Sequence, residues 1–249
     1  MQFEDYRKLK HPTPYVYRLA GKGKELLYYG SAHRADPEDP MFVDIEKRFL
    51  EFDPDIALYE GETGPVTTRS KEEAIRRGGE AEFVAFLCSQ HHIKALSATL
   101  PPPKEAELLT REFSKEEVFL YFVARGLGYR FRVGKKITRD FLEKGLSWYK
   151  KILGWKGFVF SLESLGKIHR QIVGRDLDLK DEGFWRDASN PTKDISVLNE
   201  IARRSGDLRD EFTVNFIRDI LKSYNRVFVI MGSSQAIRQE PHLRKLIEG

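Results

Sequence analysis

Five short apolar runs alternate along the chain with longer segments of helical periodicity. The runs are 14–20 (PYVYRLA), 26–30 (LLYYG), 55–60 (DIALYE), 93–98 (IKALSA) and 226–231 (RVFVIM). Their content of β-branched and aromatic residues, bounded by glycine, proline or polar residues, predicts strands. Strands separated by helices need crossover connections, which predicts an α/β fold with a central, mostly parallel sheet flanked by helices. Only Gly21-Lys22-Gly23-Lys24 separates the first two runs, so we expect a hairpin there and a mixed sheet.

Two amphipathic segments between these strands predict helices. Phe42, Ile45, Phe49 and Phe52 share one helical face, and Ala81, Val84, Ala85 and Cys88 share another. The second segment begins with a capping-box pattern at 70–73 (SKEE) and passes through Gly78-Gly79, which is expected to divide it into two helices.

The middle of the chain predicts a helical insertion at 104–194 within a single domain of residues 1–249. Segments 114–127 and 138–153 are each predicted to be helices, and 157–173 is either a third helix or a strand followed by a helix. The charged, turn-rich segment 174–194 has no apolar period, so we expect a loop that covers a cleft or is mobile. A last long helix is predicted at 207–224.

The composition excludes several classes of protein. No apolar run approaches the ~18 residues that span a bilayer, and the N-terminal sequence MQFEDYRKLKHPTP lacks the apolar core of a signal peptide. We therefore expect a cytoplasmic protein without membrane contact. The single cysteine, Cys88, excludes an intrachain disulfide, and its apolar surroundings (FVAFLCSQ) favour a buried thiol over a nucleophile.

Three predicted strands end in motifs that carry polar side chains, namely GSAH (30–33), YEGE (59–62) and GSSQ (232–235). The carboxyl ends of parallel strands share one edge of a sheet, so His33, Glu60, Glu62 and Gln235 are expected to converge there. An imidazole and carboxylates suit Zn, Mn, Co or Fe, and a metal-bound water is a nucleophile. In the alternative reading, His33 and Gln235 only cap helices and Glu60 pairs with an arginine.

The order of these motifs resembles a known superfamily. GSAH after a strand, the strand end DIALYEGE, and LRDEFTVNFIRDIL leading into RVFVIMGSSQ are similar to the TraB/GumN/PrgY, Tiki and erythromycin-esterase-like proteins, which are related to the ChaN haem-binding proteins. The resemblance implies that His33 and Glu60 occupy metal or catalytic positions. It also implies that Arg209 is catalytic and that Asp210 is a neighbouring cleft residue. A divalent metal is the cofactor implied; haem bound through Tyr28, Tyr29 or His33 is the less favoured one.

The sequence departs from the superfamily's pattern at two places. Gln235 stands where the family has its second histidine, and an amide oxygen is a weaker metal ligand that transfers no proton near neutral pH. Leu100 precedes Pro101 where related sequences often carry a glutamate. Glu80 and Arg77 compensate if Gly78-Gly79 bends the chain toward the strand ends; otherwise they are exposed charges of a capped helix.

Three functions are compatible with these features. The favoured one is a hydrolase for an unknown small-molecule or peptide substrate, in which His33 and Glu60 bind metal or act as base and Arg209 stabilises negative charge. The alternative is a degenerate member that binds a ligand or protein without turnover. The third is a nucleic-acid-associated protein, based on RGLGYRFRVGKKITR (125–139) and its cations Arg130, Arg132, Lys135 and Lys136. A solvated face with inward aromatics is the preferred reading of that stretch, and the sequence leaves the oligomeric state open.

Overall fold

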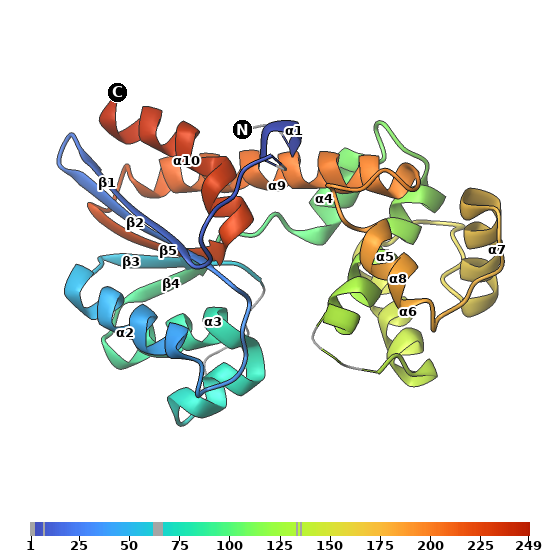
Figure 1. The fold of residues 1–249 in the computed structure, drawn as a ribbon, viewed down its shortest axis with the longest axis horizontal. Coiled ribbons are helices and arrows are strands. Elements are labelled where there is room, and N and C mark those ends of the chain that lie inside the picture. The colour runs from blue at the N-terminus through green and yellow to red at the C-terminus, as the bar shows by residue number, and fades with distance from the viewer. Residues whose placement is uncertain (1–2, 7, 62–66, 133, 135) are drawn as a thin grey trace. The chain divides into compact units, whose positions relative to one another are not determined.

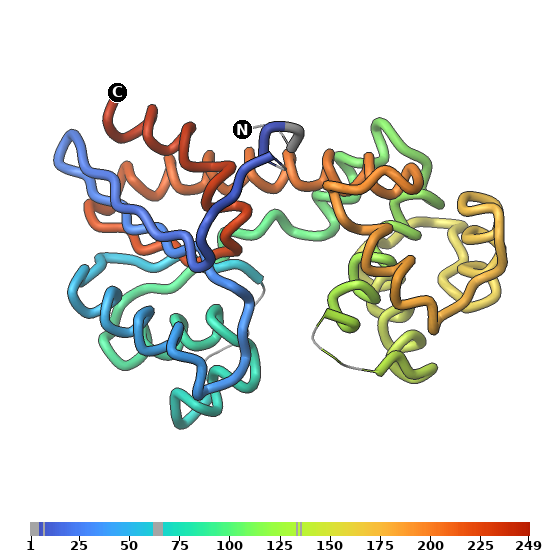
Figure 2. The backbone as a smooth tube through the Cα atoms, viewed as in Figure 1, coloured from blue at the N-terminus to red at the C-terminus, as the bar shows by residue number. Residues whose placement is uncertain are grey.

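The computed structural model describes residues 3–6, 8–61, 67–132, 134 and 136–249. These residues form two compact units, the first made of Met1–Thr99 and Asp210–Gly249 and the second of Leu100–Arg209. Figure 2 follows the chain out of the first unit after strand β4 (Lys94–Ser97) and back within helix α9 (Val197–Ile220). The predicted helical insertion, 104–194, falls inside the second unit.

The first unit contains a five-stranded sheet in the order β1-β2-β5-β3-β4. Besides β4, its strands are β1 (Tyr15–Gly21), β2 (Lys24–Ser31), β3 (Ile56–Tyr59) and β5 (Arg226–Gly232). Strands β1 and β2 are antiparallel and form the predicted hairpin, and every other pairing is parallel. The expected α/β fold with a mixed, mostly parallel sheet is therefore confirmed.

Both faces of this sheet are buried because successive side chains along each strand point to opposite sides. Tyr29, Phe228 and Ile230 pack in one apolar cluster, with side chains of helices α2 (Pro40–Phe52) and α3 (Lys71–Gln90). Tyr28 and Val229 pack in a second cluster, with the C-terminal part of α9 and helix α10 (Ser233–Glu248). Figure 1 shows α2 and α3 on one side of the sheet and α10 on the other.

Helix α3 contains the break that its glycine pair predicts. Ser70 caps its start by accepting a hydrogen bond from the backbone N–H of Glu73, and Gly78 and Gly79 have non-helical backbone angles. Gly79 has a φ of 60°, and a Cβ on it would lie 2.6 Å from the carbonyl oxygen of Arg34. The left-handed conformation and this close approach both require glycine.

The second unit is helical in the residues that the structure describes. Its helices are α4 (Pro102–Leu109), α5 (Lys115–Arg132), α6 (Arg139–Leu153), α7 (Leu162–Val173), α8 (Glu182–Ala188) and the N-terminal part of α9. For 157–173, the helix without a preceding strand is the alternative that forms. No helix in the described part of the chain combines the length and apolar composition needed to cross a membrane.

Two predictions for this unit are wrong in part. The segment 174–194 is not entirely a loop, because Asp181 caps helix α8 by accepting from the N–H of Phe184, and the ring of Trp185 is fully buried. Helix α9 begins at Val197 instead of 207, because Leu198 and Ile201 continue its buried face toward the N-terminus. Helix α8 is short and is anchored by Trp185, so its sequence shows no helical period that would have predicted it.

Candidate functional site

The carboxyl ends of β2, β3 and β5 meet at one edge of the sheet. Ser31 pairs with Gly232 across β2 and β5, and Tyr59 pairs with Ile230 across β3 and β5. The chain continues from these positions into His33, Glu60 and the first turn of α10. The parallel register therefore places the three predicted motifs side by side.

His33 adopts a left-handed backbone conformation just beyond the end of β2. Its φ is 53°, which is uncommon for a residue with a Cβ and costs about 1–3 kcal/mol. Its side chain is 55% exposed. The imidazole thus lies at the sheet edge within reach of solvent, in a conformation that surrounding contacts must hold.

Glu80, which follows the glycine break in α3, supplies one of those contacts. The Nδ1 atom of His33 and Oε1 of Glu80 lie 2.6 Å apart, and the Ser31 hydroxyl donates to the same oxygen over 2.6 Å. The Glu80 side chain is 10% exposed. If the Glu80 carboxylate accepts from Nδ1–H, the proton of the neutral imidazole is on Nδ1 and Nε2 is the acceptor nitrogen.

The other ring nitrogen of His33 faces the remaining predicted residues. Its Nε2 atom lies 3.9 Å from Oε2 of Glu60. The backbone N–H of Gly232 lies 3.3 Å from Oε2 of Glu60 and 3.2 Å from Oε1 of Gln235, and donates to both. A Cβ on Gly232 would lie 2.6 Å from Nε2 of His33, so glycine is needed for this approach. His33, Glu60 and Gln235 therefore converge around Gly232.

These three side chains offer one imidazole nitrogen, one carboxylate and one amide oxygen to a metal ion. Transition-metal sites are usually built from three or four histidine, cysteine or carboxylate ligands. Among the described residues, no group of three or more such side chains has an arrangement that could hold a metal. The metal site that the resemblance implies therefore stays a prediction.

Asp210 is part of a buried polar network on the α9 side of the sheet. One carboxylate oxygen lies 2.9 Å from Nη2 of Arg238, and the other accepts from the amide of Gln239 over 2.8 Å. Gln239 in turn accepts from the Tyr28 hydroxyl over 2.8 Å. Burial, with the negative charges of Asp210 and Glu60 contributing, raises the pKa of Tyr28, which stays a neutral donor. Asp210 therefore connects α9 to α10 instead of ending in solvent.

The remaining predicted site residues have other surroundings. Arg77 donates two hydrogen bonds to Glu82 and one to Thr67. Arg209 belongs to the second unit, where its charge helps to lower the pKa of Glu105. Glu62 lies outside the described residues.

The tyrosines considered as haem ligands have buried rings. The hydroxyl of Tyr29 donates to Asp44, as that of Tyr28 does to Gln239. Binding haem iron through either phenol would require breaking these contacts.

Part of the basic stretch 125–139 makes structural contacts. Arg125 makes two hydrogen bonds to the buried carboxylate of Glu105, and Arg130 lies over the ring of Phe141 at 4.0 Å from its centroid. Burial lowers the pKa of Arg132. Lys135 lies outside the described residues. These contacts give Arg125 and Arg130 structural roles, whereas Tyr129 is 55% exposed and does not turn inward as the preferred reading expects.

Two contributors to the site have no role in the sequence-based prediction. Ser31 supports Glu80, and Gly232 leaves room for the His33 ring. Ser31 belongs to the motif GSAH and Gly232 to the motif GSSQ. The small residues of these two motifs were the sequence signal that could have indicated a close approach of side chains. The sequence could not show that His33 and Ser31 share a hydrogen-bonding partner in Glu80.

The fold and this cluster define an α/β protein with a histidine between two carboxylates at the carboxyl edge of its sheet. No model of a known protein family matches the chain, nor does any curated protein or solved structure. The superfamily resemblance therefore remains a prediction from the motifs alone.

Proposed function

We propose that this protein is a hydrolase in which His33 acts as the general base that activates water. The observation that carries the proposal is the 2.6 Å contact between Nδ1 of His33 and Glu80, which leaves Nε2 as the proton acceptor. A base oriented by a carboxylate through its other ring nitrogen is a recurring arrangement in hydrolytic enzymes. The half-exposed imidazole is accessible to water and to a substrate.

In the proposed reaction, a water molecule transfers a proton to Nε2 of His33 as its oxygen attacks a carbonyl or phosphoryl group. The imidazolium that forms is stabilised by Glu80 on one side and by Glu60, whose Oε2 lies 3.9 Å from Nε2, on the other. His33 then returns the proton to the leaving group. The roles of Arg209 in stabilising negative charge and of a divalent metal in acidifying the water remain predictions from the resemblance.

The test compares hydrolysis of chromogenic carboxylic and phosphoric esters by the natural protein and by His33→Ala. His242→Gln is the matched control, because His242 is an exposed histidine of the first unit. We expect His33→Ala to lose hydrolysis and His242→Gln to retain it, with and without added Zn, Mn, Co or Fe. Equal rates for the natural protein and His33→Ala under every metal condition would refute the proposal.

The second candidate is a protein that binds a ligand at this edge without turnover, and the position of Gln235 favours it. Its amide oxygen already accepts the N–H of Gly232, so this side chain acts as a helix cap and transfers no proton. In that case ligands would bind with an affinity that depends on His33 and Glu60, and no substrate would be converted.

A further inference from the structure

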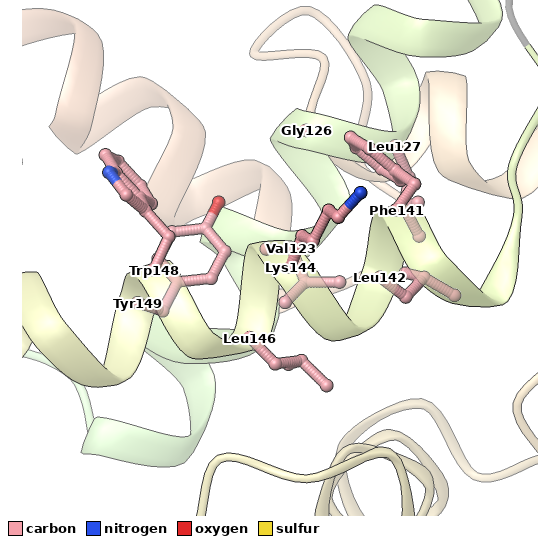
Figure 3. A pocket seen from close by; sticks show the side chains of 10 residues that line it. Val123, Gly126, Leu127, Phe141, Leu142, Lys144, Leu146, Trp148 and Tyr149 are labelled. Carbon is pink, nitrogen blue, oxygen red and sulfur yellow. The ribbon is translucent and has the colours of Figure 1, made fainter.

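A pocket of about 320 Å³ lies between helices α5 and α6 of the second unit. This volume is at the lower end of the range of ~300–1,000 Å³ typical of small-molecule sites. In Figure 3, Trp148 and Tyr149 form one side, Phe141 and Leu142 lie on the other, and Lys144 stands between them. The pocket is independent of the His33 cluster, which belongs to the first unit.

Two glycines in helix interiors create the space. Gly126 in α5 and Gly145 in α6 both line the pocket. A Cβ on Gly145 would meet no atom within 4 Å, and one on Gly126 would meet only the Tyr149 hydroxyl at 3.8 Å. Neither packing nor a positive φ requires glycine here, although glycine weakens a helix relative to alanine. The chain therefore loses helix stability at two positions that leave the pocket open.

The walls are apolar and held in place. The Tyr149 hydroxyl donates to the backbone carbonyl of Phe122 over 2.9 Å, and the two rings stack with their planes 6° apart. The indole of Trp148 stays 44% exposed at the pocket. Such walls accept a hydrocarbon body and remove it from water.

The charge beside the pocket is positive. Of the described residues that line it, Lys144 alone is charged, and Arg130 lies over the ring of Phe141, another lining residue. Asp140 pairs with Lys144 over 2.8 Å, but both side chains are more than 70% exposed, so water screens this pair. Two cations and one carboxylate leave a net positive charge for the head of a ligand.

We propose that this pocket binds a small apolar carboxylate, with its hydrocarbon body between α5 and α6 and its carboxylate at Lys144. The space beside Gly126 and Gly145 and the aromatic walls accommodate the hydrocarbon part of the ligand, and the positive charge attracts its carboxylate. A neutral molecule of the same length should bind more weakly, and a cationic one weakest.

Isothermal titration calorimetry with octanoate, 1-octanol and octylammonium tests both parts. Gly145→Leu fills the pocket, and Gly166→Leu is the matched control because a Cβ on Gly166, inside α7, also meets nothing within 4 Å. We expect the natural protein and Gly166→Leu to bind octanoate, and Gly145→Leu to bind it at least about tenfold more weakly. Equal affinities of the two leucine variants, or no binding of any probe at millimolar concentration, would overturn the proposal.

Charge reversal provides a variant that does not depend on core packing. The exposed Lys144 can be changed to glutamate without filling or emptying the pocket. Lys144→Glu should weaken octanoate roughly two- to fivefold, leave octanol unchanged and strengthen octylammonium. Unchanged affinities of Lys144→Glu for octanoate and octylammonium would refute the role of Lys144 and with it the carboxylate assignment.

Discussion

His33 and Glu80 are 47 positions apart in the chain, yet Nδ1 of the imidazole and Oε1 of the carboxylate lie 2.6 Å apart. The contact forms because the chain kinks at Gly78-Gly79 immediately before Glu80. Ser31, two residues before His33, donates to the same carboxylate oxygen. In the proposed reaction, Glu80 is thus a positioning residue that acts through His33.

Glu80→Gln tests this relationship. Since an amide group is neutral, it cannot stabilise the imidazolium as a carboxylate does, and its NH₂ group can force the proton onto Nε2. We expect kcat for ester hydrolysis to fall about 10–100-fold with little change in KM. Glu72→Gln, at an exposed position in the first turn of the same helix, should leave kcat unchanged. A rise in KM without a fall in kcat would mean that Glu80 contacts the substrate instead.

Gly232→Ala tests the close approach on the other side of the imidazole. The added Cβ would lie 2.6 Å from Nε2 of His33, so the ring must move, while the φ of −63° at Gly232 accepts alanine. We expect a stability cost of about 1 kcal/mol, typical of alanine at a helix N-cap. Hydrolysis should fall about tenfold or more, because small misplacements of a reacting group are costly.

Gly166→Ala is the control for this substitution, since a Cβ there meets nothing within 4 Å. Thermal unfolding and hydrolysis are measured for both variants. Unchanged hydrolysis in folded Gly232→Ala would show that Nε2 of His33 is not the reacting atom.

The strands were predictable because a strand that is buried on both faces has a continuous apolar run. The first two helices were predictable because a helix that is buried on one side has apolar residues at a helical period. Tyr28 and Tyr29 illustrate the first pattern, since they point into different apolar clusters. Phe42, Ile45 and Phe49 illustrate the second, since all three pack in one cluster. Such patterns record which side of an element is buried.

The site was predictable only where it follows a strand end. Parallel pairing explains why His33, Glu60 and Gln235 meet, but the contact with Glu80 depends on the direction of a helix after a glycine break. The sequence left two alternatives open for Glu80 because it does not encode that direction in any local pattern. Helix α8 and the pocket between α5 and α6 depend in the same way on contacts between distant segments.

The buried carboxylate of Glu105 predicts acid sensitivity of the second unit. Burial raises its pKa, but the charge of Arg125, hydrogen bonds from Arg125 and Ser205, and the charge of Arg209 outweigh this and lower it. The unfolded chain has the ordinary pKa of about 4.3. The stabilisation is therefore complete above about pH 5 and is lost as the pH falls through the lower pKa of the folded protein.

Glu105→Gln should lower the free energy of unfolding by about 3 kcal/mol near pH 7, because Arg125 loses its charged partner. It should also flatten the loss of stability below about pH 5. Thermal unfolding followed by circular dichroism across this pH range checks both effects. Glu107→Gln, an exposed glutamate in the same helix α4, should leave the melting temperature unchanged. If the melting temperatures of Glu105→Gln and the natural protein fell in parallel below about pH 5, protonation of Glu105 would not be the cause of the acid sensitivity.

Cys88 should be inert in the folded protein. Its side chain is buried, and burial raises its pKa to about 12. At about pH 8 only about one thiol in ten thousand would then be ionised, and the thiolate is the reactive form. We expect a chromogenic disulfide reagent to label Cys88 in concentrated guanidinium chloride and to leave it unmodified under native conditions. Rapid labelling of the folded protein would show that this thiol is accessible.

Gln235→His separates the two candidate functions. An imidazole at this position would add a second nitrogen ligand to His33 and Glu60, which gives three strong ligands around Gly232. We expect Gln235→His to bind Zn or Co at least about tenfold more tightly than the natural protein, with affinity that falls on acidification because protons compete for the imidazoles. The double variant that also carries His33→Ala should lose this gain.

Hydrolysis measured on the same proteins then decides between catalysis and binding. If the natural protein hydrolyses esters and Gln235→His does not improve on it, the base mechanism of His33 needs no second histidine. If only the metal-loaded Gln235→His variant is active, the second candidate function is supported, in which the natural protein binds a ligand without turnover. Equal metal affinity of the natural protein and Gln235→His would contradict the view that the amide of Gln235 is the weak element of the site.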